Sequence, residues 1–201
     1  MLISLISALG IAILFLHLDQ TSWAALIGCS DTIIACNGTS DDDIIYGSSN
    51  GNVIHGLGGN DYIISYGSAY RSSIINGDEG NDILIGSDLN DVLYGGIGND
   101  YYDGGRGDDT ISEALLSETG IVASDNDVIS GGEGDDFIDS GLGADMIHSG
   151  PGNDQIMPDG YHRDFSIDTI DCGSDNDRLF LFYSSDGDTQ SNCETVNDQD
   201  G

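Results

Sequence analysis

Aspartate side chains recur every nine residues through the middle of the chain, at Asp82, Asp91, Asp100 and Asp109. Each stands sixth in a nonapeptide that begins with glycine and has a large apolar or aromatic residue in eighth place. The four consecutive copies read GDEGNDILI, GSDLNDVLY, GGIGNDYYD and GGRGDDTIS. Carboxylate oxygens, together with the carbonyl oxygens of glycine-rich turns, are the hard ligands that calcium takes, about six to eight at a time. The spacing therefore predicts a series of calcium sites.

Each nonapeptide predicts a turn followed by a short strand. An apolar eighth residue between outward neighbours indicates a three-residue strand whose middle side chain points inward. Glycines in the preceding turn tolerate positive φ and let backbone carbonyls converge on one point. If two nonapeptides make one coil, stacked turns lie eighteen residues apart, which pairs Asp82 with Asp100 and Asp91 with Asp109.

The same pattern extends on both sides of this block. We count fourteen copies between 38 and 180, interrupted at 65–67, 113–121 and 158–162. The insert 113–121 has the length of one repeat, so the phase of the pattern can survive it. The eighth residues, which we expect to form the core, are Ile45, Ile54, Ile63, Ile75, Leu84, Leu93, Tyr102, Ile111, Ile129, Ile138, Ile147, Ile156, Ile170 and Leu179. Such regularity excludes a disordered acidic linker.

The charge balance narrows the classes of partner. The chain carries 36 acidic residues against four basic ones, a formal net charge of -32. Such a surface repels nucleic acid and anionic membranes, and without counterions it also repels itself. A solvated acidic or halophilic surface is the alternative to calcium binding. The aspartates stand in register instead of being scattered, which favours calcium.

Residues 38–180 resemble the hemolysin-type RTX calcium-binding repeats. The resemblance implies an all-β, right-handed parallel β-roll with two repeats per coil, holding several Ca²⁺ ions along both edges and folding when it meets calcium outside the cell. Carried over by position, the sixth-place ligands are Asp43, Asp61, Asp82, Asp91, Asp100, Asp109, Asp127, Asp136, Asp145, Asp154, Asp168 and Asp177. The turn carbonyls are those of Gly77, Gly80, Gly95, Gly96, Gly98, Gly104, Gly105, Gly107, Gly131, Gly132, Gly134, Gly150 and Gly152. Asn52 and Ser73 depart from the pattern, which puts their shared site in doubt.

The first 24 residues read as an export segment, which we expect to form an N-terminal hydrophobic leader helix. Met1 to Leu18 is nearly continuous apolar sequence, and the small residues Ser22 and Ala24 fit a signal-peptide cut after Ala24. The alternative is an uncleaved helical membrane anchor, which would be the chain's sole contact with a membrane. Both interpretations place the repeats outside the cytoplasm, extracellularly or at the cell surface.

Four cysteines follow this segment, and an even number in an exported chain predicts disulfides. Their order suggests Cys29–Cys36 in an N-terminal cap at 25–37, and Cys172–Cys193, which joins the last repeat to a C-terminal cap and acidic tail at 181–201. Asn37 begins a glycosylation sequon. The alternative, a metal site formed by the cysteines, is not supported, because they lack C-x-x-C spacing.

No separate catalytic domain is expected, because leader, repeats and caps occupy nearly the whole chain. The G-x-S-x-G sequence at 47–51 lies inside a repeat, without the helix that a hydrolase nucleophile elbow needs. We therefore predict no enzyme. The expected role is a structural or adhesive element at the cell surface or in extracellular matrix. The alternatives are a module accompanying an enzyme or toxin on a partner chain, and a plain calcium buffer.

Self-association is also expected. If alternate repeats share a sheet, their outward seventh and ninth residues make one apolar and aromatic face, composed of Ile44, Tyr46, Tyr62, Ile64, Ile83, Ile85 and Tyr101. The opposite sheet is expected to be more polar. Large exposed apolar faces are uncommon in soluble monomers. Either a second copy of the chain or another partner covers this face, or the insert at 113–121 folds over it.

Overall fold

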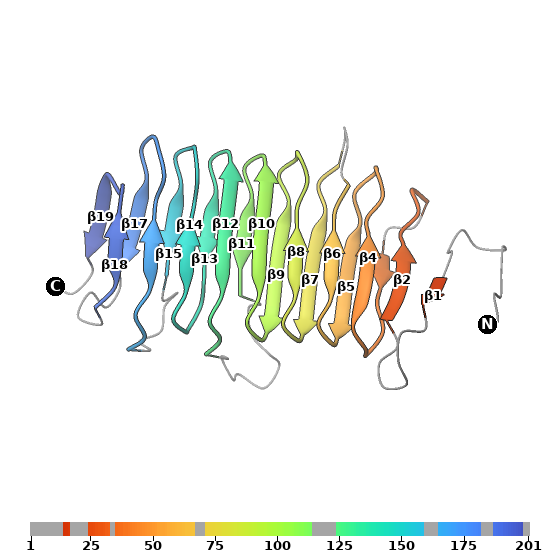
Figure 1. Ribbon diagram of the computed structural model, residues 1–201. Helices are drawn as coiled ribbons and strands as arrows, with labels where there is room; N and C mark the ends of the chain where they lie inside the picture. The colour runs from red at the N-terminus through yellow and green to blue at the C-terminus, as the bar shows by residue number, and fades with distance from the viewer. Residues whose placement is uncertain are drawn as a thin grey trace.

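The computed structural model describes residues 14–16, 24–32, 35–66, 71–113, 124–158, 165–181 and 187–198. All regular secondary structure in these ranges is strand, arranged in two sheets that run the length of an elongated stack (Figure 1). One sheet contains, in spatial order, β1 (Leu14–Leu16), β2 (Ala24–Gly28), β4 (Asp43–Tyr46), β6 (Tyr62–Ile64), β8 (Ile83–Ile85), β10 (Tyr101–Arg106), β12 (Val128–Glu133), β14 (Met146–His148), β16 (Thr169–Asp171) and β18 (Thr189–Ser191). The other contains β3 (Ala35–Asn37), β5 (Val53–Gly58), β7 (Ile74–Glu79), β9 (Val92–Ile97), β11 (Thr110–Ser112), β13 (Phe137–Asp139), β15 (Gln155–Met157), β17 (Arg178–Leu181) and β19 (Thr195–Asp198).

From β2 onward, neighbouring strands within each sheet are parallel, and the chain crosses from one sheet to the other after every strand. Leu84 therefore pairs with Tyr102, and Ile75 pairs with Leu93, each eighteen residues further along the chain. This is the coil of two nonapeptides that the spacing predicts. Below, the sheet that contains β4, β8 and β12 is called the even sheet, and the sheet that contains β5, β9 and β13 is called the odd sheet.

The core is a single file of inward side chains from each sheet. All fourteen predicted core residues are at most 2% exposed, and they belong to one apolar cluster. Each strand contributes one of them because successive side chains on a strand point to opposite faces. Such a narrow core buries little apolar surface per residue, so the turns at both edges must contribute to the cohesion of the roll.

Interruptions in the repeat leave the pairing of the strands on either side in register. Across the insert at 113–121, Tyr102 pairs with Ile129, twenty-seven residues on, yet β10 and β12 are direct neighbours with their inward residues in register. The strands on either side of the shorter interruptions are also in register, since Ile54 pairs with Ile75 and Ile147 pairs with Ile170. The expected phase survives because the strands before and after each interruption are direct neighbours with their inward residues paired.

Both caps are themselves coils of the roll, at opposite ends of the stack (Figure 1). At the N-terminal end, Ile27 and Cys36 pair with the first core residues, Ile45 and Ile54, and a disulfide joins Cys29 to Cys36. Residues 14–16, which we expected in a leader helix, form the strand β1, antiparallel to β2. The rest of the predicted leader, 1–13 and 17–23, lies outside the described residues. In the described part of the chain, no helix has the length and hydrophobicity required to cross a membrane.

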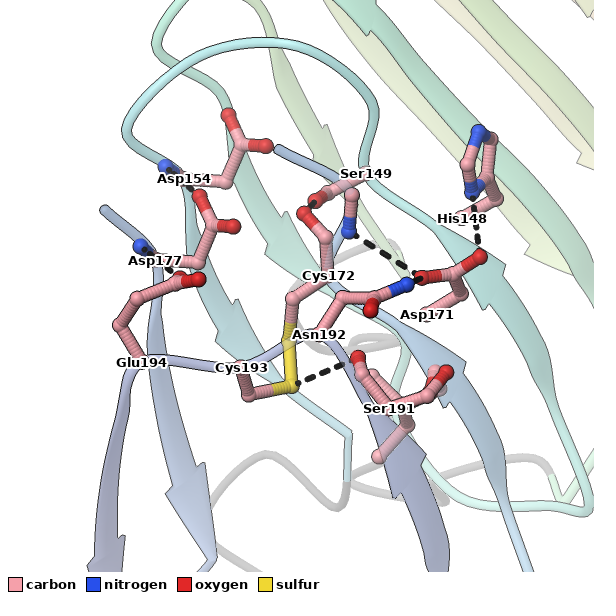
Figure 2. Close-up of a disulfide and its surroundings, with 12 residues drawn as sticks. His148, Ser149, Asp154, Asp171, Cys172, Asp177, Ser191, Asn192, Cys193 and Glu194 are labelled. Carbon is pink, nitrogen blue, oxygen red and sulfur yellow. Dashed lines mark hydrogen bonds and ion pairs between the residues drawn. A yellow bond between two sulfur atoms is a disulfide. The ribbon is translucent and has the colours of Figure 1, made fainter. Parts of the chain in front are cut away.

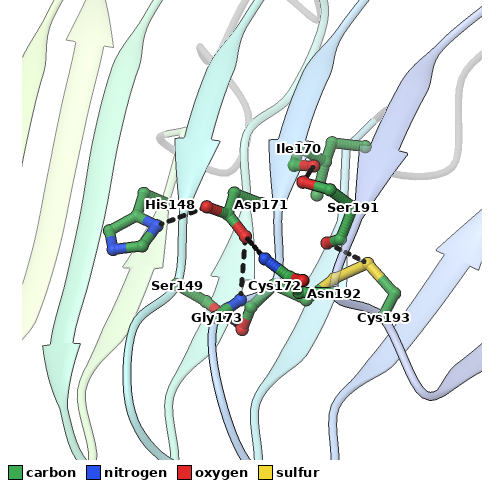
Figure 3. Close-up of polar contacts among 9 residues, drawn as sticks. All are labelled: His148, Ser149, Ile170, Asp171, Cys172, Gly173, Ser191, Asn192 and Cys193. Carbon is green, nitrogen blue, oxygen red and sulfur yellow. Dashed lines mark hydrogen bonds and ion pairs between the residues drawn. A yellow bond between two sulfur atoms is a disulfide. The ribbon is translucent and has the colours of Figure 1, made fainter.

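At the C-terminal end, β18 and β19 extend the two sheets by one strand each. The disulfide Cys172–Cys193 links this last coil to the one before it (Figure 2). Asn192 donates a 2.7 Å hydrogen bond to Asp171, which also lies 3.4 Å from His148 (Figure 3). These contacts lower the pKa of Asp171, chiefly through the Asn192 amide. The final coil is therefore fastened by a covalent bond and by a polar chain across β14, β16 and β18.

Candidate metal sites

The turns are built from glycines that allow very close stacking. Gly96 and Gly98, second and fourth in their repeat, have φ of 107° and 130°, which side-chain-bearing residues rarely adopt. A β-carbon on Gly98 would collide with the carbonyl oxygen of Gly80 in the preceding coil, and one on Gly77 would collide with Oδ2 of Asp82. Turn carbonyls and aspartate carboxylates are thus brought into one small space at the edge of the roll. The other predicted turn glycines hold the first, second or fourth place: Gly80, Gly95, Gly104, Gly105, Gly107, Gly131, Gly132, Gly134, Gly150 and Gly152.

The sixth-place aspartates form a ladder along each edge. The backbone N–H of Asp82 donates a 2.7 Å hydrogen bond to Oδ1 of Asp100, and that of Asp91 donates a 2.6 Å bond to Oδ1 of Asp109. All twelve predicted aspartates are at most 2% exposed. The even-sheet edge carries Asp43, Asp61, Asp82, Asp100, Asp127, Asp145 and Asp168, and the odd-sheet edge carries Asp91, Asp109, Asp136, Asp154 and Asp177.

The second carboxylate oxygen of these aspartates faces the glycine turn. In the described part of the chain, Oδ2 accepts no hydrogen bond in Asp61, Asp82, Asp100, Asp109, Asp136 and Asp177. Burying an acceptor without a donor is costly, and burying a charge without a partner costs more. A cation beside these oxygens would remove that cost. Hard oxygens from carboxylates and carbonyls fit calcium, which tolerates irregular geometry.

Burial makes these carboxylates weak acids when no cation is bound. Desolvation, and then the charges of neighbouring aspartates, raises the pKa of Asp82 to about 6, of Asp61 and Asp136 to about 7, and of Asp100 and Asp109 to about 8. In the described part of the chain, none of these five carboxylates forms an ion pair with a basic side chain. A divalent cation and a proton compete for the same oxygens.

Asn52 and Ser73 interrupt the odd-sheet ladder with neutral groups. The backbone N–H of Ser48 donates a 2.6 Å bond to Oδ1 of Asn52, and the hydroxyls of Ser65 and Ser73 lie 2.7 Å apart. Hydrogen bonds between neutral groups thus replace the carboxylates at this level. The edge offers no sixth-place carboxylate here, in line with the doubt that the sequence raised.

The structure adds two acidic residues to the ladders. The backbone N–H of Asp168 donates a 2.9 Å bond to Oδ1 of Asp188, and that of Asp177 donates a 3.0 Å bond to Oε2 of Glu194 (Figure 2). Gln190 occupies the inward place after Asp188, which hides that repeat from the pattern, whereas Val196 keeps the inward place after Glu194 apolar. A signal in the sequence was available: Asp188 and Glu194 are each followed by threonine, as are Asp109 and Asp168.

A second ladder runs in the opposite direction through the fifth place of each repeat. The backbone N–H of Asn81 donates a 2.8 Å bond to Oδ1 of Asn60, and that of Asn99 donates one of the same length to Oδ1 of Asn81. Sixth-place side chains accept from the preceding coil, whereas fifth-place side chains accept from the following one. Together they hold adjacent turns at a fixed spacing, which an ion between two turns requires.

Comparison with protein families agrees with this geometry. The family model of the RTX calcium-binding nonapeptide repeat (4 copies) matches residues 37–67, 76–111 and 123–156, about half of the chain. The matched segments contain most of the two aspartate ladders. Comparison with curated proteins and with solved structures finds no match.

Proposed function

The chain belongs to the family of RTX calcium-binding nonapeptide repeats, and from this premise we propose that its calcium-loaded roll acts outside the cell as a self-assembling structural or adhesive element. Binding of several calcium ions follows from the family, and the buried carboxylate ladders are the ligands we propose for them. In the proposed mechanism, calcium neutralises stacked aspartates and its binding free energy becomes folding free energy. The two disulfides support an oxidising compartment outside the cytoplasm.

The observation that carries the assembly proposal is a continuous apolar row on the even sheet. Seventh-place residues of successive strands are direct neighbours, in the order Ile44, Tyr62, Ile83, Tyr101, Val128 and Met146. Apart from the half-buried Tyr62, they are between 37% and 57% exposed. The ninth-place residues Tyr46, Ile64 and Ile85 lie beside them. An exposed row of this length is typical of an interaction surface.

The odd sheet is less polar than expected. Its seventh places include Val53, Ile74, Val92 and Phe137, and Ile74 is 39% exposed. The apolar row is shorter on the odd sheet, where Thr110 follows Val92, and Gln155 and Arg178 follow Phe137. The even sheet is therefore the more continuous apolar surface. The insert, which the sequence offered as a cover for this face, lies largely outside the described residues.

Charge on the even sheet tests this proposal. Tyr62→Asp with Ile83→Asp places two like charges on adjacent strands of the row, and we expect it to abolish assembly while calcium-induced folding persists. Ile74→Asp with Val92→Asp is the matched control, with the same charges on adjacent strands of the odd sheet. For the full chain in calcium, sedimentation velocity measures the mass of the assembly and circular dichroism measures folding. Assembly of the even-sheet variant would overturn the role of this face.

Two other functions predict different results in the same experiment. A calcium buffer would remain a monomer at every calcium concentration. A module that serves an enzyme or toxin would produce hydrolytic or lytic activity together with its partner chain. The row on the even sheet favours assembly over the buffer because a buffer has no need of an exposed apolar surface.

A further inference from the structure

Three carboxylates meet where the insert leaves the roll. Asp100 and Asp127 are neighbours in the even-sheet ladder, and Glu113 is the first residue of the insert. One carboxylate oxygen from each of the three lies within 4.8 Å of the other two. Oxygens bound to one calcium ion are at most about 5 Å apart, twice the Ca–O distance. The three groups can therefore share an ion.

Glu113 stands where the backbone of a regular turn would be. In regular turns the second-place glycine packs against a backbone carbonyl of the preceding coil, as Gly150 does against Gly132. At Gly141, the corresponding glycine above the insert, the nearest neighbour is the side chain of Glu113. The backbone N–H of Glu113 donates a 3.1 Å bond to the carbonyl of Asp139, which holds the residue in line with the roll. The aliphatic part of the Glu113 side chain thus fills a place that a backbone carbonyl occupies elsewhere.

Tyr102 supplies an independent sign of a ligand. It is the sole aromatic residue among the fourteen inward positions and is 1% exposed, and its hydroxyl has no hydrogen-bond partner in the described part of the chain. A β-carbon on Gly95 would collide with both this hydroxyl and Oδ2 of Asp100, so the two oxygens face the same point. A buried hydroxyl without a partner is costly, unless a bound group satisfies it.

We propose that Asp100, Glu113 and Asp127, with the Tyr102 hydroxyl, form a calcium site whose ligand set differs from that of the repeat sites. This inference rests on calcium binding by the repeats and adds one carboxylate ligand that the repeat pattern lacks. A ligand set with more negative charge binds calcium more tightly. This site therefore fills first as calcium rises, and it fixes the root of the insert to the even-sheet edge.

The decisive variant is Glu113→Gln, which keeps the size of the side chain and removes its charge. Glu133→Gln is the matched control, because Glu133 is exposed and lies 3.4 Å from Arg106 at the surface. The calcium affinity of the full chain is measured by competition with a chromophoric chelator. We expect Glu113→Gln to weaken the tightest class of site by about tenfold or more, and the control to bind as the unaltered chain does.

The outcomes separate this inference from calcium binding itself. If the unaltered chain bound no calcium, the function of the repeats would be wrong. If it bound calcium and Glu113→Gln gave the same curve, only the site at the insert would be overturned. Circular dichroism in calcium shows whether the variant folds.

Tyr102→Phe provides a second test that leaves all three carboxylates in place. Terbium substitutes for calcium and luminesces when a nearby tyrosine absorbs. We expect the luminescence of the first bound terbium, excited through tyrosine, to fall several-fold in Tyr102→Phe, with later equivalents little changed. Unchanged luminescence of the first bound terbium would contradict the placement of the first ion beside Tyr102, whatever the behaviour of Glu113→Gln.

Discussion

The backbone N–H of Asp100 donates a 2.7 Å hydrogen bond to Oδ1 of Asp127, which lies twenty-seven residues further along the chain. The bond from Asp82 to Asp100 has the same length across eighteen residues. Nine added residues therefore leave the ladder geometry unchanged. The physical reason is that a solenoid coil is fixed by contacts with the coils on either side, and lengthening the connection between two strands adds only a small entropic cost.

Removing the insert should accordingly preserve the roll. Deletion of 113–121 joins Ser112 directly to Val122, as ninth and first places are joined in the uninterrupted copies. We expect the same β signal in saturating calcium. The loop-closure contribution to stability should change by less than about 1 kcal/mol, because loop closure depends weakly on length, and a larger loss would come from the calcium site that Glu113 completes. Circular dichroism with urea unfolding in calcium measures both.

The same deletion should remove the tightest calcium site, because it removes Glu113. Deleting nine residues from within a block, such as 86–94, is the matched control, since it removes one strand and reverses the sheet assignment of all later repeats. If the two deletions were equally damaging, the insert would be part of the packed coil.

Calcium-free protein should gain stability on acidification. The pKa of Asp61 is raised to about 7 and that of Asp100 and Asp109 to about 8, so the folded chain holds protons that the unfolded chain releases at lower pH. This contribution is fully present below the ordinary aspartate pKa of about 4, and it is lost as pH rises from about 4 to 8. In chelator, we expect the β signal to grow as pH is lowered through this window.

Calcium binding should show the opposite dependence on pH. The calcium affinity should increase as pH rises from about 4 to 8. Below about pH 8, calcium binding should release protons, because ion and proton compete for the same oxygens. Calorimetry in buffers of different ionisation enthalpy counts the protons. High salt, which screens the exposed carboxylates but not the buried ones, is the control. A pH dependence that disappears in high salt would assign the effect to the exposed surface charge.

The two disulfides should stabilise opposite ends of the roll. Cys172–Cys193 closes a sequence separation of 21 residues and Cys29–Cys36 one of 7. The chain-entropy relation gives roughly 3 kcal/mol for the first and roughly 2.5 kcal/mol for the second. We expect replacement of each pair by alanine to cost about these amounts in the calcium-loaded chain, measured by urea unfolding.

Hydrogen exchange would locate each effect. Loss of Cys172–Cys193 should speed exchange in β17 to β19 and leave β4 to β6 unchanged, and loss of Cys29–Cys36 should do the reverse. This follows because each coil of a solenoid contacts only its neighbours, so that a weakened end opens without the rest. Uniform acceleration along the chain would show that the roll opens as one unit.

The interior of the roll was predictable because its determinants are local. A strand of three residues buries its middle side chain wherever it lies, so Ile45 or Leu179 could be placed from spacing alone, and the partner of Asp82 follows from the coil length. The core residues and the aspartate pairs depend only on positions within a repeat. The two disulfides were predicted separately, from the order of the cysteines along the chain.

What the sequence did not reveal depends on pairing between distant segments. Gln190 is a poor core residue, so the last coil is recognisable only once β18 lies beside β16. Likewise, the spacing of repeats does not say whether nine extra residues fill a coil or loop out. The position of Glu113 beside Asp100 and Asp127 follows from that choice, and it was therefore missed.

Glycine at the fourth place of the repeat should be essential to the stacking of the turns. Gly98 has φ of 130°, and a β-carbon there would collide with the carbonyl oxygen of Gly80. Gly98→Ala must therefore push two turns apart and break the bonds that run from Asp82 and Asn99 to their neighbouring coils. We expect a loss of at least about 2 kcal/mol in calcium, since strain and lost hydrogen bonds add.

Gly28→Ala is the control for this substitution. Gly28 ends the first strand of the roll, and a β-carbon there meets no atom within 4 Å. The change should be neutral or slightly stabilising, because alanine restricts the unfolded chain. Urea unfolding of both variants in calcium, with calcium affinity measured alongside, makes the comparison. Equal stability of the two variants would mean that the turns can separate without cost, and the close stacking of carbonyls would then not be what positions the calcium ligands.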